Sequence, residues 1–144
     1  MIVNERVVSY INSLDRGNSD ICNIIEKEAI EDQVPIIRKE MGNLLKVLLK
    51  LKQPKSILEV GTAVGYSSIL ISENMPVDCK IVTIENYDKR IPIARNNIKR
   101  AGKEDCIQLI EGDAMEVLKE LEGPFDFIFM DAAKGQYINY LPEV

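Results

Sequence analysis

Hydrophobic and polar positions change their spacing near residue 55 of the chain. Before that point, apolar residues recur with the period of an amphipathic helix. After it, they gather in short runs that alternate with amphipathic segments. The pattern therefore predicts a helical N-terminal part followed by alternating strands and helices.

Two apolar stripes predict the N-terminal helices. The apolar residues of each stripe recur at the spacing of one helical face, and Pro54 ends the second helix. We interpret the part of the second stripe from Leu44 to Leu51 as ordinary hydrophobic core, in preference to a dimerisation surface. The stripes comprise Val7, Val8, Ile11 and Leu14, and then Ile37, Met41, Leu44, Leu45, Leu48 and Leu51.

Four short apolar runs predict strands. Strands that are apolar on both faces and alternate with helices are typical of a parallel sheet covered by helices. We therefore predict an α/β fold in a single domain, with a helical cap at residues 1–54 and a doubly wound core at residues 55–144. The last run would form an apolar sheet edge, which soluble proteins avoid, so we expect a fragment that is incomplete at its C-terminal end. The runs are 57–60, 81–84, 107–110 and 125–130.

The composition narrows the possible chemistry. The 144 residues are 46% hydrophobic and 28% charged, as in ordinary globular proteins. No apolar run approaches the length of a membrane span, about 18 residues, and we expect a cytoplasmic protein. The three cysteines form no Cys-x-x-Cys pair, and the absence of histidine excludes Ser-His-Asp and Cys-His mechanisms. Acid–base chemistry would fall to carboxylates, lysine or tyrosine.

Positive charge is concentrated in two stretches, although the net charge is −5. Residues 38–55 contain six basic side chains against Glu40 alone, and residues 89–103 contain six more. Such runs are usually solvated helix faces. They are also what phosphate contacts with a nucleic acid would require.

The loop after the first predicted strand has the glycines of a ligand-binding turn. Gly61 and Gly65 lie between that strand and Ser67 at the start of a helix, where α/β sheets bind cofactors. The spacing is neither that of a dinucleotide motif nor that of a phosphate loop, so by itself it is a weak signal. Glu59 adds to it, because an acid at the end of an apolar strand needs a donor. That donor is either a cationic amino-acid moiety of a ligand or a structural partner within the protein.

Acidic residues also follow the next two predicted strands. Glu85 stands where Rossmann-type sheets place an acid that accepts both hydroxyls of a ribose. Asp113 precedes Ala114 and can cap the following helix or face a ligand, and both roles are compatible at that edge. Acids at the ends of three successive strands favour a shared ligand site.

The fourth predicted strand ends at Asp131, and Lys134 follows about one helical turn later. Carboxylate oxygen is a hard ligand that suits Mg²⁺ or another divalent cation. A lysine beside such a cation can act as a base, because the cation lowers its pKa. A salt bridge between the two residues is the alternative.

From the helix before Pro54 to the final residues, these motifs resemble the divalent-cation-dependent O-methyltransferases of the catechol and caffeoyl-CoA type. The resemblance implies a Rossmann-like class I methyltransferase fold with S-adenosylmethionine as methyl donor. It also implies Mg²⁺ at Asp131 and Lys134 as the catalytic base, with Asp131 contributing to catalysis. Family members continue further and add an Asp-Asn pair that completes the metal site, which this chain lacks. The resemblance places these residues at the cofactor: Glu59, Gly61, Thr62, Gly65, Ser67, Glu85, Asp113, Ala114 and Asp131.

The implied methyl acceptor is a hydroxyl beside a second oxygen, because a cation at Asp131 would hold both oxygens. The run from Asp131 to Tyr137 most resembles the bacterial branch that includes tRNA 5-hydroxyuridine methyltransferases. Together with the basic stretches, it leads us to expect 5-hydroxyuridine in tRNA as the acceptor. A catechol or caffeoyl-CoA-like small molecule is the alternative. The resemblance further implies a homodimer of the full-length protein.

Two interpretations from other classes stay open. A nicotinamide oxidoreductase would use Glu85 for its ribose, but the third glycine of its motif is missing. A truncated, non-catalytic cofactor-binding or dimerisation module would use the helical cap as its interface. Binding of S-adenosylmethionine or of NAD would separate the enzyme classes.

Overall fold

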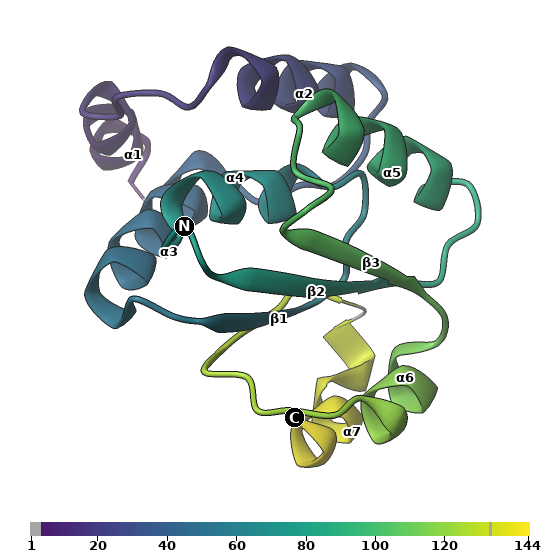
Figure 1. The fold of residues 1–144 in the computed structure, drawn as a ribbon. Helices are drawn as coiled ribbons and strands as arrows, with labels where there is room; N and C mark the ends of the chain where they lie inside the picture. Colours follow the sequence, from purple (N-terminus) through teal and green to yellow (C-terminus); the bar gives the residue numbers. More distant parts are fainter. Residues whose placement is uncertain (1–3, 133) are drawn as a thin grey trace.

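The computed structural model describes residues 4–132 and 134–144, and for Lys134 the backbone alone. A four-stranded, fully parallel sheet lies between two layers of helices (Figure 1). This confirms the predicted α/β class. The strands are β1 (Ser56–Val60), β2 (Lys80–Glu85), β3 (Ile107–Glu111) and β4 (Phe127–Met130).

All four predicted runs form strands, but β4 begins two residues later than the sequence predicted. Asp126, the second residue of the predicted run, turns its carboxylate toward the beginning of β1. It accepts hydrogen bonds from the Lys55 N–H at 3.0 and 3.2 Å and from the Ser56 N–H at 3.1 Å. These bonds fix the entry of β4 beside β1 before the strand proper starts.

The strand order is β3-β2-β1-β4. From β1 the chain moves outward through β2 to β3, and then returns to place β4 on the other side of β1. Val60 at the end of β1 is level with Ile84 of β2 and with Met130 of β4. The carboxyl ends of these three strands therefore meet at one edge. The reversal of direction beside β1 is the switch point at which open α/β sheets bind ligands.

The helices form two layers around the sheet (Figure 1). Helices α2, α3, α4 and α5 lie on one side, with α1 beside α3, and α6 and α7 lie on the other. Two 3₁₀ turns, Lys134–Gln136 and Leu141–Glu143, flank α7. The helices are α1 (Glu5–Ser13), α2 (Asp20–Glu31), α3 (Lys39–Lys52), α4 (Tyr66–Asn74), α5 (Ile91–Arg100), α6 (Ala114–Glu120) and α7 (Tyr137–Tyr140).

Each face of the sheet has its own hydrophobic core, because successive side chains of a strand point to opposite faces. Ile57 of β1 packs with the helices of the α4 side, whereas its neighbours Leu58 and Val60 pack with α6 and α7. Glu59 stands between Leu58 and Val60 and therefore points to the α4 side. This alternation brings an acid from the centre of the sheet against the first turn of α4.

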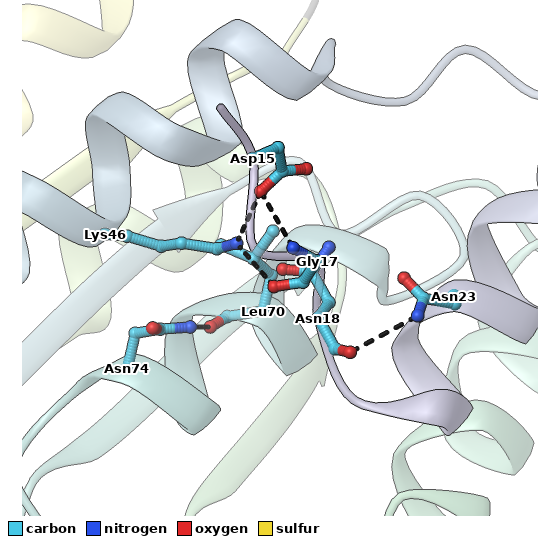
Figure 2. Close-up of polar contacts among 7 residues, drawn as sticks. All are labelled: Asp15, Gly17, Asn18, Asn23, Lys46, Leu70 and Asn74. Carbon is cyan, nitrogen blue, oxygen red and sulfur yellow. Dashed lines mark hydrogen bonds and ion pairs between the residues drawn. The ribbon is translucent and has the colours of Figure 1, made fainter. Parts of the chain in front are cut away.

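Polar contacts of the segment between α1 and α2 hold this segment against α3 within the N-terminal cap (Figure 2). Lys46 of α3 forms an ion pair with Asp15 at 3.8 Å and donates a hydrogen bond to the Gly17 carbonyl at 3.3 Å. Asp15 also accepts a hydrogen bond from the Gly17 N–H at 3.1 Å. The cap is joined to the core by Arg100 of α5, which donates to both carboxylate oxygens of Glu28 in α2, at 2.7 and 2.9 Å.

The expectation that the second stripe is ordinary core was wrong for most of its residues. Leu45 and Leu49 are buried, but Leu51 is 77% exposed. The reason is Gly42, whose missing side chain brings α3 close to Leu70 of α4 and turns the face of Gly42, Leu45 and Leu49 inward. The outward residues of the stripe are Met41, Leu44, Leu48 and Leu51.

No helix within residues 4–132 and 134–144 combines the length and the apolar character needed to cross a membrane.

Candidate functional site

A cavity of about 850 Å³ lies at the carboxyl edge of the sheet, around the switch point between β1 and β4. Six of the residues predicted at the cofactor line it, and three others, Glu59, Gly65 and Asp113, do not. The six are Gly61, Thr62, Ser67, Glu85, Ala114 and Asp131. The remaining lining residues are Pro35, Ile36, Ile37, Val60, Ala63, Tyr66, Ile84, Asn86, Tyr87, Arg90, Gly112, Ala132 and Tyr140.

Glu59 is fully enclosed, and its carboxylate has partners within the protein. It accepts hydrogen bonds from Ser67 and Thr83, each at 2.5 Å, and from Ser68. Burial raises the pKa of this carboxyl, the three hydroxyl donors oppose that rise, and the charge of Asp131 adds to it. The donor that the sequence required for Glu59 is therefore present in the fold.

When Glu59 is ionised, it can only accept, and each hydroxyl around it carries a single proton, so the hydrogen bonds have fixed directions. Thr83 donates to Glu59, so Thr62 must be the donor in the 2.6 Å bond that it shares with Thr83. Ser67 likewise gives its proton to Glu59, and Ser67 lines the cavity. Toward the cavity, Ser67 therefore presents lone pairs, which suit a cationic ligand group.

Glu85, at the end of β2, connects two loops of the cavity. Its Oε2 accepts a hydrogen bond from the Ala63 N–H at 2.7 Å, and its Oε1 accepts from Asn86 and Tyr87 N–H groups, each at 3.0 Å. A carboxylate has about four lone-pair positions, so capacity for a ligand donor remains. Although only 9% exposed, Glu85 lines the cavity and is positioned to use that capacity there.

The two glycines of the loop after β1 have different structural roles. Gly61 has φ of 102°, and a Cβ there would overlap the backbone carbonyl of Asp131. Its N–H donates to the Ile84 carbonyl at 3.0 Å, so the loop is held against the ends of both neighbouring strands. Gly65 has φ of 84° and precedes the first turn of α4. The loop thus needs glycine for close packing at one position and for backbone conformation at both.

Asp113 caps α6, as the sequence allowed. Its side chain accepts a hydrogen bond from the Met115 N–H at 2.9 Å. Gly112 before it has φ of 158°, and Ala114 after it lines the cavity. The cap therefore precedes a residue of the cavity wall, while the exposed Asp113 itself does not line the cavity.

Asp131 follows β4 at the carboxyl edge of the sheet and lines the cavity. Its N–H donates to the Val60 carbonyl at 2.9 Å, which keeps the residue level with the end of β1. The side chain of Lys134, the predicted base, lies outside the described residues. Among the side chains that are described, no group of three or more Asp, Glu, Cys or His residues gathers to hold a metal ion. Asp131 alone would supply only part of the ligands that a metal ion needs.

Several residues in and behind the cavity wall were not predicted from the sequence. Behind the wall is Thr83, a polar residue inside an apolar strand, and the register of β1 and β2 places it level with Glu59. Tyr87 and Arg90 form a cation–π pair at the end of β2, with the guanidinium 5.2 Å from the ring centroid. Tyr140 of α7 and the segment 35–37 of the cap complete the wall from distant parts of the chain.

The two basic stretches are partly neutralised by ion pairs on the protein itself. In the first, Lys46 pairs with Asp15. In the second, Arg95 pairs with Glu111 at 2.5 Å, and Arg100 with Glu28 at 2.7 Å. These pairs weaken the argument that the stretches form a surface for nucleic-acid phosphates.

Comparison with known proteins agrees with this geometry. Residues 18–144 match the O-methyltransferase family. The chain is 35% identical over 142 residues to a catechol O-methyltransferase from Niastella koreensis, covering 94% of the chain and 64% of that protein. It is 39% identical over 108 residues to caffeoyl-CoA O-methyltransferase 1 from Eucalyptus globulus, covering 69% of the chain and 42% of that protein.

Among solved structures, the fold is similar to that of an O-methyltransferase from Bacillus cereus in complex with SAH. The TM-score is 0.86 at 28% identity, and the match covers 96% of this chain and 66% of that one. The chain spans less than two thirds of the length of the curated relatives described above. With 127 consecutive residues, 18–144, matched to one family, the chain belongs to the O-methyltransferases.

Proposed function

We propose that this chain is the cofactor-binding part of an S-adenosylmethionine-dependent O-methyltransferase. Its acceptor would be a small molecule of the catechol or caffeoyl-CoA type, with a hydroxyl beside a second oxygen. The observation that carries the proposal is the cavity at the switch point between β1 and β4, with Glu85 in its wall, in a chain of this family. The SAH bound to the similar Bacillus cereus enzyme supports the choice of cofactor.

The donors and acceptors of the cavity fit the parts of S-adenosylmethionine. The lone pairs that Ser67 presents suit the ammonium of its amino-acid end. The capacity left on Glu85 suits the ribose hydroxyls, as acids at the end of a second strand do in Rossmann-type sheets. Ala114 and Gly112 would form the wall beside the adenine. The volume of about 850 Å³ is within the range of small-molecule sites.

The bound cofactor would supply a methyl group that its sulfonium already activates. The protein therefore has to align the acceptor with that methyl group and keep water away. Much of the barrier to such a transfer is the entropy lost when the two reactants are brought together in the right orientation. Gly61 and Ser67 would hold the amino-acid end at the end of β1. Ile36 and Ile37 of the cap would exclude water from their side of the cavity.

The predicted divalent cation stays a prediction. Asp131 is exposed at the edge of the cavity and offers one hard carboxylate, whereas Mg²⁺ usually needs further ligands from protein, substrate or water. The described side chains do not form a complete site on their own. The roles of Lys134 as base and of a homodimer as the assembled form also stay predictions.

A small-molecule acceptor is favoured over the tRNA that the sequence suggested. The relatives described above are named for catechol and caffeoyl-CoA. Moreover, Lys46, Arg95 and Arg100 in the basic stretches have acidic partners on the protein. Phosphate contacts supply most of the non-specific affinity for nucleic acids, and such pairing reduces what these stretches offer.

The cofactor can be tested by calorimetry with S-adenosylhomocysteine and with NAD. We expect saturable binding of the first and none of the second, and binding of NAD alone would overturn the proposal. The acceptor can be tested by methyl transfer to catechol and to a tRNA bearing 5-hydroxyuridine, each at low and high salt. Transfer to tRNA alone, with a steep loss at high salt, would restore the RNA interpretation.

A further inference from the structure

Tyr140 brings the C-terminal end of the described chain into the cofactor cavity. It is the last residue of α7, which lies beside α6 on the face of the sheet opposite α4 (Figure 1). The side chain is only 7% exposed and packs with Val60, Ile84 and Leu118. Tyr140 nevertheless lines the cavity. Its ring is therefore fixed by the core while part of the side chain reaches the ligand space.

The hydroxyl of Tyr140 is available to a ligand. Within residues 4–132 and 134–144, Asn12 Oδ1 is the single enclosed side-chain oxygen or nitrogen without a hydrogen-bond partner. The Tyr140 oxygen makes no hydrogen bond to any described residue and is not among the enclosed unpaired atoms, which agrees with its place at the cavity. Buried tyrosine hydroxyls usually have a partner, and a ligand in the cavity would supply one.

The electrostatic surroundings keep this hydroxyl protonated. Burial raises the pKa of Tyr140, and the nearby charge of Asp113 raises it further. A protonated phenol is a hydrogen-bond donor. The unsubstituted ring nitrogens of adenine are acceptors without a proton. Tyr140 packs in the same cluster as Ala114, the first residue of α6, α6 contacts α7, and both residues line the cavity together with Gly112.

We propose that Tyr140 is a ligand-contact residue whose hydroxyl donates a hydrogen bond to the adenine base of the bound nucleoside. The inference rests on the proposed function, because that function places the ribose at Glu85 and the amino-acid end at Ser67. The part of the wall that Tyr140 shares with Gly112 and Ala114 is then left for the base. Tyr140 thereby links occupancy of the cavity to the position of α7.

The test is Tyr140→Phe, which removes the hydroxyl and keeps the ring. Its affinity for S-adenosylhomocysteine and for adenosine is measured by calorimetry. We expect both to weaken by about 3- to 10-fold, the effect of one hydrogen bond. Tyr137→Phe is the matched control, because Tyr137 lies on the same helix, packs against the same core and does not line the cavity. It should bind both ligands as the unaltered protein does.

The possible outcomes separate the two proposals. Unaltered binding by Tyr140→Phe, in a protein that binds S-adenosylhomocysteine, overturns the inference and leaves the proposed function standing. A loss seen with S-adenosylhomocysteine but not with adenosine overturns the assignment to the base. If the unaltered protein binds neither ligand, the proposed function fails and the inference fails with it. The unfolding temperature of the ligand-free Tyr140→Phe protein shows that its fold is intact.

Discussion

The Ala63 N–H donates a hydrogen bond of 2.7 Å to the carboxylate of Glu85, which lies 22 residues further along the chain. The bond ties the loop after β1 to the end of β2 and helps to hold Ala63 at a positive φ of 49°. Glu85 therefore shapes the loop that passes the cavity and also faces the cavity itself. One carboxylate serves both the structure of the site and its proposed ligand.

Replacing Glu85 with glutamine should weaken binding of S-adenosylhomocysteine by about tenfold or more, because hydrogen bonds to a charged group are stronger than those to a neutral one. Calorimetry measures the affinity. The matched control is Glu111→Gln, at the end of the next strand, where the side chain is half exposed and pairs with Arg95 outside the cavity. Equal affinities of the two variants would contradict the role of Glu85.

Gly61→Ala should destabilise the protein more than a change at another left-handed glycine. Gly102 has φ of 62° and open space around it, so Gly102→Ala carries the conformational cost alone, about 1 kcal/mol. At Gly61 the new Cβ also overlaps the Asp131 carbonyl, and we expect about 2 to 4 kcal/mol. Urea denaturation of both variants compares the two costs. A similar loss at both positions would show that the close approach is unimportant.

Helix α3 offers a matched pair of leucines. Leu49 is fully buried, so Leu49→Ala should lower the free energy of unfolding by about 2 to 5 kcal/mol. Leu51 is 77% exposed, and Leu51→Ala should change it by less than about 0.5 kcal/mol. Denaturant titrations of the two variants provide the comparison. A large effect at Leu51 would mean that the outward face of α3 is covered in solution.

Glu59 should make stability fall as the pH rises. Its folded-state pKa is raised by burial above the ordinary value of 4.5, so the native protein holds the proton to higher pH than the unfolded chain does. The stability from this group is therefore complete below pH 4.5 and is lost as the pH rises through the raised value. Glu59→Gln removes this titration. As the pH rises above 4.5, the unaltered protein should lose stability relative to the variant, as urea denaturation at each pH would show. If the stabilities of the two proteins changed in parallel with pH, the prediction would be contradicted.

The sequence was a good guide to the sheet and to the acids at its edge. Parallel strands put their carboxyl ends together, so an acid after each apolar run had to approach a common place. Glu85 and Asp131 consequently line one cavity. The same pattern could not reveal Thr83, because only the register of β1 and β2 places it beside Glu59.

Long-range packing decided what the sequence could not predict. On α3, apolar residues occupy two adjacent faces, and hydrophobic spacing does not tell which face meets the core. Gly42 selects the buried face by allowing α3 to approach Leu70. The cap residues Ile36 and Ile37 and the distant Tyr140 reach the cavity through packing of this kind. No motif in the sequence around these residues predicts that they reach the cavity.

The position of β4 beside β1 has a consequence for how the protein assembles. Ile57 is level with Ile81 of β2, but also with Phe127 of β4, much further along the chain. Closing a longer loop costs more entropy, so contacts within β1, β2 and β3 should form before β4 joins them. Asp131 and Tyr140 reach the cavity only with that last strand. A ligand that touches both would bind the finished sheet selectively and would therefore stabilise the state in which β4 is in place.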